Sequence, residues 1–259
     1  MGCELRASLP GFRSSAIDLS DQRYLDNPDV GIIVLERLKN VEGLTISATS
    51  ALAPKDAQKA FNKGVEAAKK GNPDEAQRDF QKAVEIYPKY AYAWYELGRV
   101  YEQRDHFDDA RHAYTQAIVA DSKYVTPYER MYMMAVHDTK WDDVARITDQ
   151  VLHLNPYDFP GAYYFNAVAK MYLGDLESAE KSAREAVKID AGRNPRAGYI
   201  LGLVLARKGE FVAATEYLSA YLKTLPEGKD ADVVRKQLAD AQQRAQAKAA
   251  APDAPKPDK

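Results

Sequence analysis

The sequence predicts a mainly α-helical solenoid of five helical hairpins with a capping helix, preceded by a small N-terminal β segment. Three observations lead to this fold class. Residues 57–228 repeat with a period of 34 or 35 residues. Within each period, small residues recur at two fixed places, and a turn-forming sequence separates two helical stretches. Such a period is typical of arrays of two-helix units, in which each unit buries its apolar face only against its neighbours.

Residues 1–53 precede the repeats and have the pattern of short strands. Apolar and polar side chains alternate over residues 3–9 and again over residues 44–49, and residues 32–35 form a continuous apolar run. Pro10-Gly11 marks a turn, and one further short apolar run follows it. We expect about four strands here, too few to cover their own apolar face and edges.

The five repeats match one another unequally. They cover residues 57–90, 91–124, 125–158, 160–193 and 195–228, with Phe159 and Asn194 as extra residues between them. Glycine or alanine stands at the eighth and twentieth places of every repeat except the third, which carries Tyr132 and Val144 there. Small residues at these places let two helices approach closely, which offsets the cost of about 1 kcal/mol of a glycine inside a helix. We therefore expect repeats three and four to pack less regularly than repeats one and two.

The turns agree with the predicted hairpins. Gly71-Asn72-Pro73 offers a glycine that ends one helix and a proline suited to the start of the next, and Gly174 and Gly209 stand at equivalent turns. Beyond the last repeat, residues 230–249 carry apolar side chains at helical spacing along one side, and we expect a capping helix there. Residues 250–259 are rich in Ala, Pro, Asp and Lys and are expected to be disordered.

The second repeat carries the most distinctive motif. It reads Trp94-x2-Leu97-Gly98-x2-Tyr101, followed by Ala110-x3-Tyr114. This spacing resembles the tetratricopeptide repeat. The resemblance covers residues 57–228 and, with the capping helix, implies a repeat domain over residues 54–249. It also implies a fold that holds proteins or peptides, and we expect no enzyme activity.

A second resemblance concerns the N-terminal segment. The stretch from Glu4 to Phe12 is similar to the closing strands of a carboxypeptidase-regulatory-like β-sandwich, a module often placed before helical repeats in bacterial envelope proteins. It implies that residues 1–53 are a partial sandwich, with its upstream strands and any secretion signal missing from this chain. A location in the cell envelope or periplasm would follow. The N-terminus itself lacks the features of a secretory signal, so the sequence leaves the compartment open.

The resemblance to the tetratricopeptide repeat also implies a binding groove. In that family, the second, fifth, ninth, twelfth and thirteenth residues of each first helix face the concave side. Here these places include Tyr92, Tyr95, Arg99, Glu129, Met133, His137, Tyr164, Val168, Met171, Tyr172, Tyr199 and Leu203. Aromatic and methionine side chains give a large contact area at low entropy cost, which suits an extended or helical peptide. The alternative is that many of these tyrosines pack between helices.

The remaining chemistry-bearing residues favour no catalytic, metal or cofactor site. The four histidines stand at no metal-ligand spacing, and Cys3 is the only cysteine. The acid pairs Asp108-Asp109 and Asp142-Asp143 each stand early in a second helix, where negative charge favours the helix dipole. The sequence contains no phosphate loop, nucleophile elbow or zinc signature.

Charge and hydropathy argue against a nucleic-acid-binding protein and against a transmembrane helix. A net charge of -2 and a pI near 6.1 give no case for nucleic acid binding. The longest apolar run, residues 198–206, is far shorter than the roughly 20 residues that span a bilayer.

From the repeat pattern and its groove we expect a non-catalytic scaffold or adaptor that binds a protein partner in the groove. The alternative is a chaperone-like or envelope assembly factor with several clients, and the partner and oligomeric state stay open.

Overall fold

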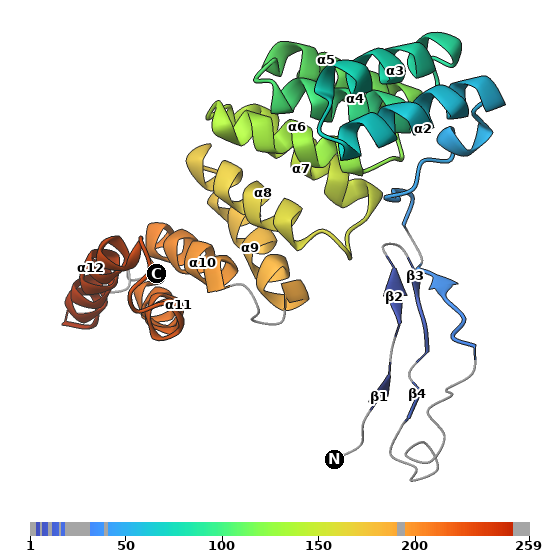
Figure 1. Ribbon diagram of the computed structural model, residues 1–259. Coiled ribbons are helices and arrows are strands. Elements are labelled where there is room, and N and C mark those ends of the chain that lie inside the picture. The colour runs from blue at the N-terminus through green and yellow to red at the C-terminus, as the bar shows by residue number, and fades with distance from the viewer. Residues whose placement is uncertain are drawn as a thin grey trace, which may run out of the picture. The chain divides into compact units, whose positions relative to one another are not determined.

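The computed structural model describes residues 4–5, 7–9, 12–15, 17–18, 32–38, 41–190 and 195–250 (Figure 1). The chain divides into two compact units, and each has its own apolar core. The first unit contains residues 1–138 and 150–158, and the second contains residues 139–149 and 159–259. The described residues are mainly helical, with one helix pair per repeat along the chain, which confirms the predicted fold class.

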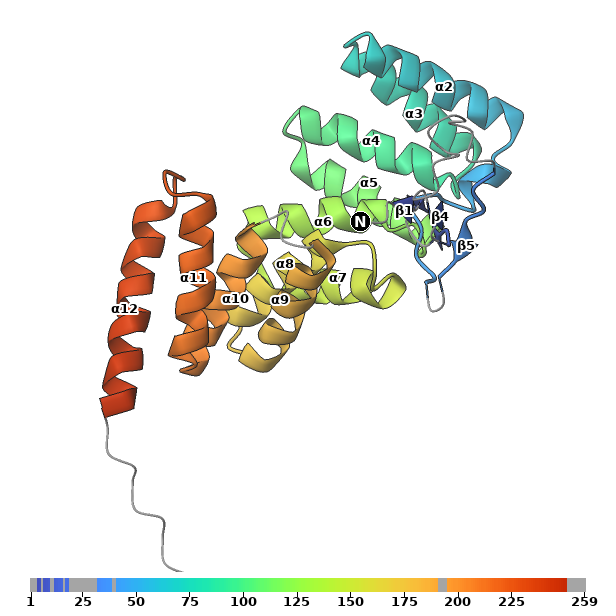
Figure 2. The ribbon, with the colours of Figure 1, turned by 90° about the horizontal axis from the view of Figure 1, so that it is seen from below.

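The first unit holds the first two hairpins and the start of the third. Its helices are α2 (Lys55–Lys69), α3 (Pro73–Ile86), α4 (Ala91–Gln103), α5 (Phe107–Ala120), α6 (Thr126–His137) and the last residues of α7 (Trp141–Leu154). Helix α2 pairs with α3 and α4 with α5, while α3 packs on α4 and α5 on α6. Figure 2 shows α2 to α5 as two successive hairpins.

The predicted glycine-mediated approach of the helices is confirmed in the first unit. A Cβ atom added to Gly64 would lie 2.7 Å from the ring of Phe80, and one added to Gly98 would lie 2.6 Å from the ring of Tyr114. Both rings are fully buried. The eighth place of the repeat therefore holds glycine because an aromatic side chain at the twenty-fourth place of the same hairpin fills the space where a side chain would stand.

The turn inside each repeat passes through the left-handed region at the fifteenth place. Three glycines stand there, with φ of 72° at Gly71, 85° at Gly174 and 79° at Gly209. Asp105 and Thr139 adopt the same conformation with φ of 59° and 55°. The predicted glycine turns are confirmed, and Thr139 is the costliest of the five residues because its branched side chain disfavours this region.

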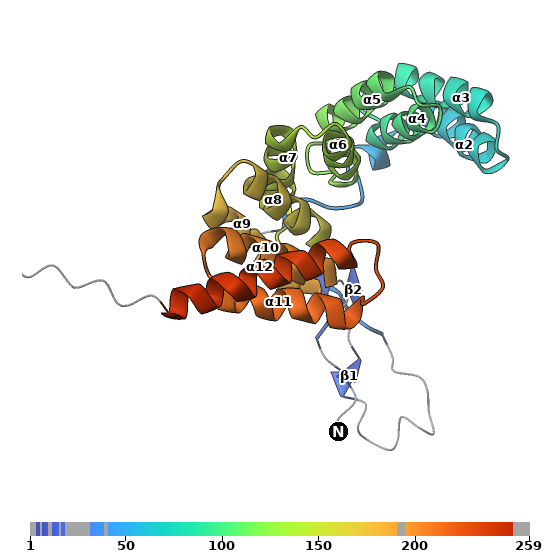
Figure 3. The ribbon, with the colours of Figure 1, turned by 90° about the vertical axis from the view of Figure 1, so that its left-hand side faces the viewer.

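The second unit contains the later hairpins and the capping helix. Besides the first residues of α7, its helices are α8 (Pro160–Tyr172), α9 (Leu176–Asp190), α10 (Pro195–Lys208), α11 (Phe211–Thr224) and α12 (Ala231–Ala250). Helix α8 pairs with α9 and α10 with α11, and α12 lies along α11 (Figure 3). Helix α12 buries Val234 and Ala241 and turns charged residues to solvent, as expected of a capping helix.

The third repeat contains the boundary between the two units, which falls after Asp138. Its two departures from the pattern, Tyr132 and Val144, are both buried. The less regular packing expected for repeats three and four stays a prediction. The expected disorder of residues 250–259 concerns a stretch that, apart from the last residue of α12, lies outside the described residues.

The N-terminal segment forms short antiparallel strands. Strand β1 (Glu4–Leu5) pairs with β4 (Ile17–Asp18), and β3 (Phe12–Arg13) pairs with both β2 (Ser8–Leu9) and β5 (Glu36–Arg37). The apolar run at residues 32–35 directly precedes β5 and is not itself a strand. The resemblance of this segment to a β-sandwich stays a prediction.

The strand predicted over residues 44–49 is wrong. In its place, residues 41–53, called the strap below, run along the loops that join one repeat to the next. The backbone N–H groups of Glu42 and Gly43 donate to the carbonyl of Leu154, at 2.9 and 2.8 Å. Leu44 forms an isolated parallel bridge with Tyr124. Leu154 ends α7, so the strap satisfies a helix-terminal carbonyl that has no partner within its own helix.

Hydrogen bonds that involve side chains also hold the strap against the repeats. The carboxylate of Asp121 accepts hydrogen bonds from the hydroxyl of Ser47 at 2.8 Å and from the N–H of Ala48 at 2.9 Å. The hydroxyl of Ser50 accepts one from the N–H of Tyr92 at 2.9 Å, at the start of α4. The side of residues 44–49 that faces the repeats is therefore the polar one, since Ser47 is buried whereas Ile46 is 57% exposed.

Candidate functional site

Two predicted groove tyrosines of the first unit are largely packing residues. The ring of Tyr92 stands edge-on to Tyr124 at 5.1 Å, and its hydroxyl donates to the carbonyl of Thr45 in the strap at 3.5 Å. Tyr95 lies 5.9 Å from Tyr124 and 5.8 Å from Tyr114, and burial raises the pKa of its hydroxyl. Both side chains therefore join a buried aromatic cluster, the alternative considered from the sequence.

The other predicted residues of the first unit are exposed. Arg99 forms an ion pair with Glu96 one turn earlier on α4, with 3.1 Å between the charged atoms. Glu129 and Met133 are exposed on α6, and His137 stacks on Phe107 with 6.2 Å between ring centroids. These side chains can reach a partner without any rearrangement of the fold.

Two adjoining pockets open beside these exposed residues, and together they are called the Glu102–Arg130 site. The first has a volume of about 260 Å³ and is lined by Arg99, Glu102, Gln103 and Arg130. The second has a volume of about 240 Å³ and is lined by Glu102, Phe107, Arg111, Arg130, Met133, Met134, His137 and Asp138. Both pockets share the ion pair of Glu102 and Arg130.

The shared ion pair is held in place from beneath. Glu102 also accepts a hydrogen bond from the hydroxyl of the buried Tyr114 at 2.7 Å. Burial and this carboxylate both raise the pKa of the Tyr114 hydroxyl, which stays protonated and acts as a donor. Burial works against the charge of Arg130, but the pairing with Glu102 outweighs it and raises the arginine pKa. The ion pair is therefore pre-organised by the Tyr114 hydroxyl that lies beneath it.

The site has an apolar side and a polar side. Phe107, Met133 and Met134 supply apolar surface between α5 and α6. Arg111 at the same pocket pairs with Asp138, which also accepts from His137 at 3.3 Å. Such a combination can bind a mixed apolar and polar peptide segment but offers no nucleophile paired with a base.

The predicted residues of the second unit divide in the same way. Met171 is only 4% exposed and lies in the apolar core, while Val168, Leu203 and Tyr164 pack against that core. Tyr199 lies 5.0 Å from Tyr221, and its hydroxyl donates to Gln237 of α12 at 3.1 Å. Met171 is therefore a core residue and not a groove residue, and the capping helix engages Tyr199.

Tyr172 is the exposed member of that set. It is 56% exposed and stacks face to face on Trp141, with 4.4 Å between centroids and 6° between ring planes. The guanidinium of Arg207 lies 5.8 Å from the centre of the Tyr172 ring and donates to the carbonyl of Met171 at 2.8 Å. This is an exposed aromatic surface with a cation beside it.

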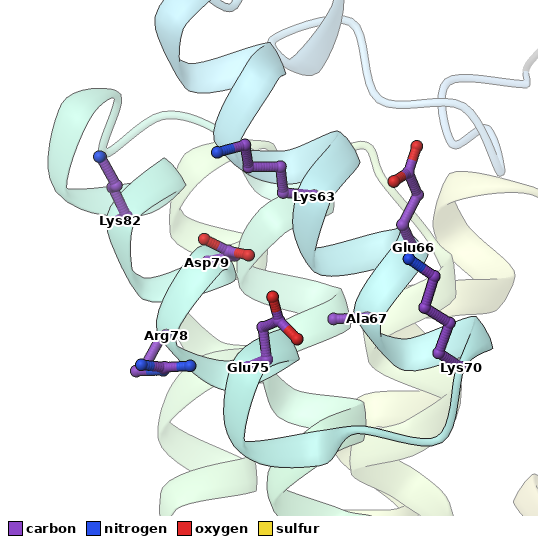
Figure 4. A pocket seen from close by; sticks show the side chains of 8 residues that line it. All are labelled: Lys63, Glu66, Ala67, Lys70, Glu75, Arg78, Asp79 and Lys82. Atoms are coloured by element: carbon purple, nitrogen blue, oxygen red, sulfur yellow. The ribbon is translucent and has the colours of Figure 1, made fainter.

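A further pocket of about 450 Å³ lies on the first hairpin, between α2 and α3. Figure 4 shows that, apart from Ala67, every side chain lining it carries a charge, and both signs are present. Residues 57–90 are the first repeat of the array, and a polar outer face is what the terminal unit of a repeat array requires.

Sequence reasoning missed part of the site. Glu102 and Gln103 occupy the twelfth and thirteenth places of the first helix in the second repeat, so the groove pattern applied in full would have found them. Phe107 and Arg111 belong to a second helix and follow no groove pattern. They join the site only through the packing of α5 against α6.

The described residues contain no cluster of His, Cys, Asp or Glu arranged to hold a metal ion. None of the helices in the described part of the chain combines the length and the apolar character that crossing a membrane requires. Every buried side-chain polar atom among the described residues has a hydrogen-bond partner.

These helix pairs define an α-solenoid built from two-helix repeats. A sequence profile of the tetratricopeptide repeat family matches residues 61–125 and 166–229. The chain is a tetratricopeptide repeat protein. No curated protein matches the sequence.

Solved structures with the same fold are distant in sequence. YrrB, described as a tetratricopeptide repeat protein with an unusual peptide-binding site, has a TM-score of 0.62 at 20% identity, over 73% of this chain and 98% of its own. MamA has a TM-score of 0.58 at 20% identity, over 69% and 95%. PilF of Pseudomonas aeruginosa has a TM-score of 0.56 at 15% identity, over 75% and 88%. At these identities the likeness shows the fold alone.

Proposed function

We propose that this protein is a non-catalytic scaffold or adaptor that holds a segment of a partner protein on the exposed first-helix residues, with the Glu102–Arg130 site as the main anchor. The observation that carries the proposal is the pair of adjoining pockets in the first unit, where Met133 is 40% exposed beside a pre-organised ion pair. Methionine and arginine are enriched in protein–protein interfaces, and arginine also in binding hot spots. The fold and the peptide-binding site named for YrrB support a peptide as the bound species.

Site-directed photo-cross-linking in cells tests this proposal. Met133 is replaced by the photoreactive benzoylphenylalanine, and the matched control carries it at Val119, which is 73% exposed on α5 in the same unit. We expect a cross-linked partner from Met133 and none from Val119. Equal cross-linking from both positions, or from Val119 alone, would contradict the proposed site.

The same cross-linked material separates an adaptor from a chaperone-like protein. An adaptor retains one dominant partner, whose abundance in mass spectra greatly exceeds that of all others. A chaperone-like or assembly factor yields many clients without sequence similarity. In either case Met133→Glu abolishes the cross-link from a photoreactive group placed at Gln103, because a carboxylate at the apolar pocket opposes insertion of an apolar side chain.

A further inference from the structure

The chemistry of the Glu102–Arg130 site also indicates what kind of segment it binds, an inference that rests on the proposed function above. Its apolar pocket of about 240 Å³ is smaller than the roughly 300–1,000 Å³ typical of small-molecule sites. Phe107 and Met133 are each 40% exposed at this pocket, and Met134 is buried. The pocket therefore suits a single large apolar side chain.

The polar side of the site presents cations outward. In the pair of Arg99 with Glu96, the arginine side chain is 48% exposed and the glutamate 25%. In the pair of Arg130 with Glu102, the corresponding values are 41% and 22%. In both pairs the carboxylate lies deeper and the guanidinium lies at the surface.

At the other end of the site, His137 is likewise more exposed than the acidic residue beside it. Its side chain is 82% exposed, whereas its neighbour Asp138 is 22% exposed. Arg111, at 31%, is also more exposed than Asp138. Two acids stand against this trend: Asp108 pairs with Arg111 and is fully exposed, and Glu129 is exposed on α6.

The outward groups at the centre of the site are therefore hydrogen-bond donors. A guanidinium has five N–H donors in a planar fork, and one carboxylate occupies at most two of them. Arg99 and Arg130 line the same pocket of about 260 Å³, so donors from two arginines converge on one space. Guanidinium donors bind carboxylates in a planar, bidentate geometry, and a carboxylate is the anionic group that an unmodified protein segment carries.

We propose that the Glu102–Arg130 site binds an acidic segment of a partner protein that inserts one large apolar side chain between Phe107 and Met133 and places a carboxylate beside Arg99 and Arg130. The two pockets adjoin through the shared ion pair, so one short segment reaches both. The chain carries a net charge of only -2, so selection for acidic partners comes from this local arrangement and not from the overall field.

Fluorescence anisotropy with short labelled peptides tests the proposal on the full chain. The peptides combine a central phenylalanine or serine with flanks of glutamate or lysine. We expect the phenylalanine peptide with glutamate flanks to bind at least about tenfold more tightly than each of the others, a difference of about 1.4 kcal/mol. Its affinity falls as salt is added, because the arginines are partly exposed.

Matched variants locate the binding. Arg99→Glu reverses one cation and is expected to weaken the acidic peptide about tenfold or more. Arg146→Glu is the control, because Arg146 is also paired with an acid three residues earlier, Asp143 at 2.9 Å, but belongs to the part of α7 in the second unit and does not line either pocket. Circular dichroism checks that both variants keep the helical content of the parent protein.

The peptide affinities and the effects of the two variants can each overturn the proposed acidic specificity. Tighter binding of lysine-flanked peptides, no binding of any peptide up to about 1 mM, or equal effects of Arg99→Glu and Arg146→Glu overturns the inference. If photo-cross-linking from Met133 still captures a partner in that case, the proposed binding function stands and only the acidic chemistry is wrong. If that cross-link also fails, the proposed function falls with it.

Discussion

The close contact between Gly98 and Tyr114 yields a prediction about stability. In Gly98→Ala, the new methyl group would lie 2.6 Å from Cε1 and 2.7 Å from Cδ1 of the tyrosine ring. The ring is fully buried, and its hydroxyl is tied to Glu102 at 2.7 Å. The ring therefore has no free direction in which to move.

The expected magnitude follows from opposing terms. Replacing a glycine inside a helix by alanine stabilises by about 1 kcal/mol. Overpacking a well-filled core costs about 1–3 kcal/mol, and loss of a hydrogen bond to a charged group costs about 1.5–3 kcal/mol. Together these terms lead us to expect that Gly98→Ala lowers the free energy of unfolding of the first unit by about 1.5–5 kcal/mol.

Gly198→Ala is the matched control. Gly198 also lies inside a helix, α10, but a Cβ atom there meets only Cδ1 of Tyr217, at an ordinary contact distance of 3.7 Å. The preference of a helix for alanine over glycine then acts without overpacking, so the free energy of unfolding of this variant is expected to rise by up to about 1 kcal/mol.

Urea denaturation combined with amide hydrogen exchange measures both variants. Exchange in α4 and α5 reports on the first unit alone, which matters because two compact units need not unfold in one step. If Gly98→Ala proves as stable as the parent chain, or if both variants shift stability in the same direction, the reasoning about the eighth place is refuted.

Three further predictions follow from other contacts. Gly43→Ala places a methyl group 2.5 Å from Cγ2 of Val125, so the strap should loosen at a cost of about 1–3 kcal/mol, measured as faster hydrogen exchange at residues 41–53. Thr139→Gly should raise the free energy of unfolding by up to about 1 kcal/mol, because threonine at a φ of 55° is strained. The thermal midpoint should rise accordingly, and an unchanged midpoint contradicts this. Pairing with Lys208 lowers the pKa of Glu180 below 4.5, so its stabilisation is full at neutral pH and lost on acidification. Urea midpoints between about pH 6 and pH 3 should therefore fall further in the parent chain than in Glu180→Gln.

The hairpins and their turns were predictable because their causes are local. Gly71 ends one helix with a left-handed residue, and the side chain of Asn72 accepts from the N–H of Glu75 at 3.4 Å to cap the next. Proline follows at the first position of α3, where its missing N–H costs nothing. Each of these effects acts over a few residues, so the sequence shows it directly.

The strap could not be predicted in the same way. Alternation of apolar and polar residues over 44–49 indicates an extended chain with two unlike sides. It does not say which side faces the repeats, and in the structure Ser47 is buried while Ile46 is 57% exposed. The choice depends on Asp121 and the carbonyl of Leu154, which are distant in sequence and come close only through the stacking of the repeats.

The candidate site was predictable in part. Arg99 and Met133 stand at groove places and are exposed, whereas Tyr92, Tyr95 and Met171 stand at such places and are packed. The groove pattern describes the direction of a side chain from its own helix. It contains no information on the neighbours that cover it.

By itself, the sequence determined the two-helix repeat, its period, its glycine contacts and the capping helix, because spacing along a helix and turn chemistry are short-range properties. Tertiary structure alone decided which groove side chains stay exposed, where the strap lies, and how Phe107 and Arg111 join Glu102 and Arg130 in one site. These features depend on contacts between residues far apart in the chain, where burial and charge pairing are settled only once the helices have packed.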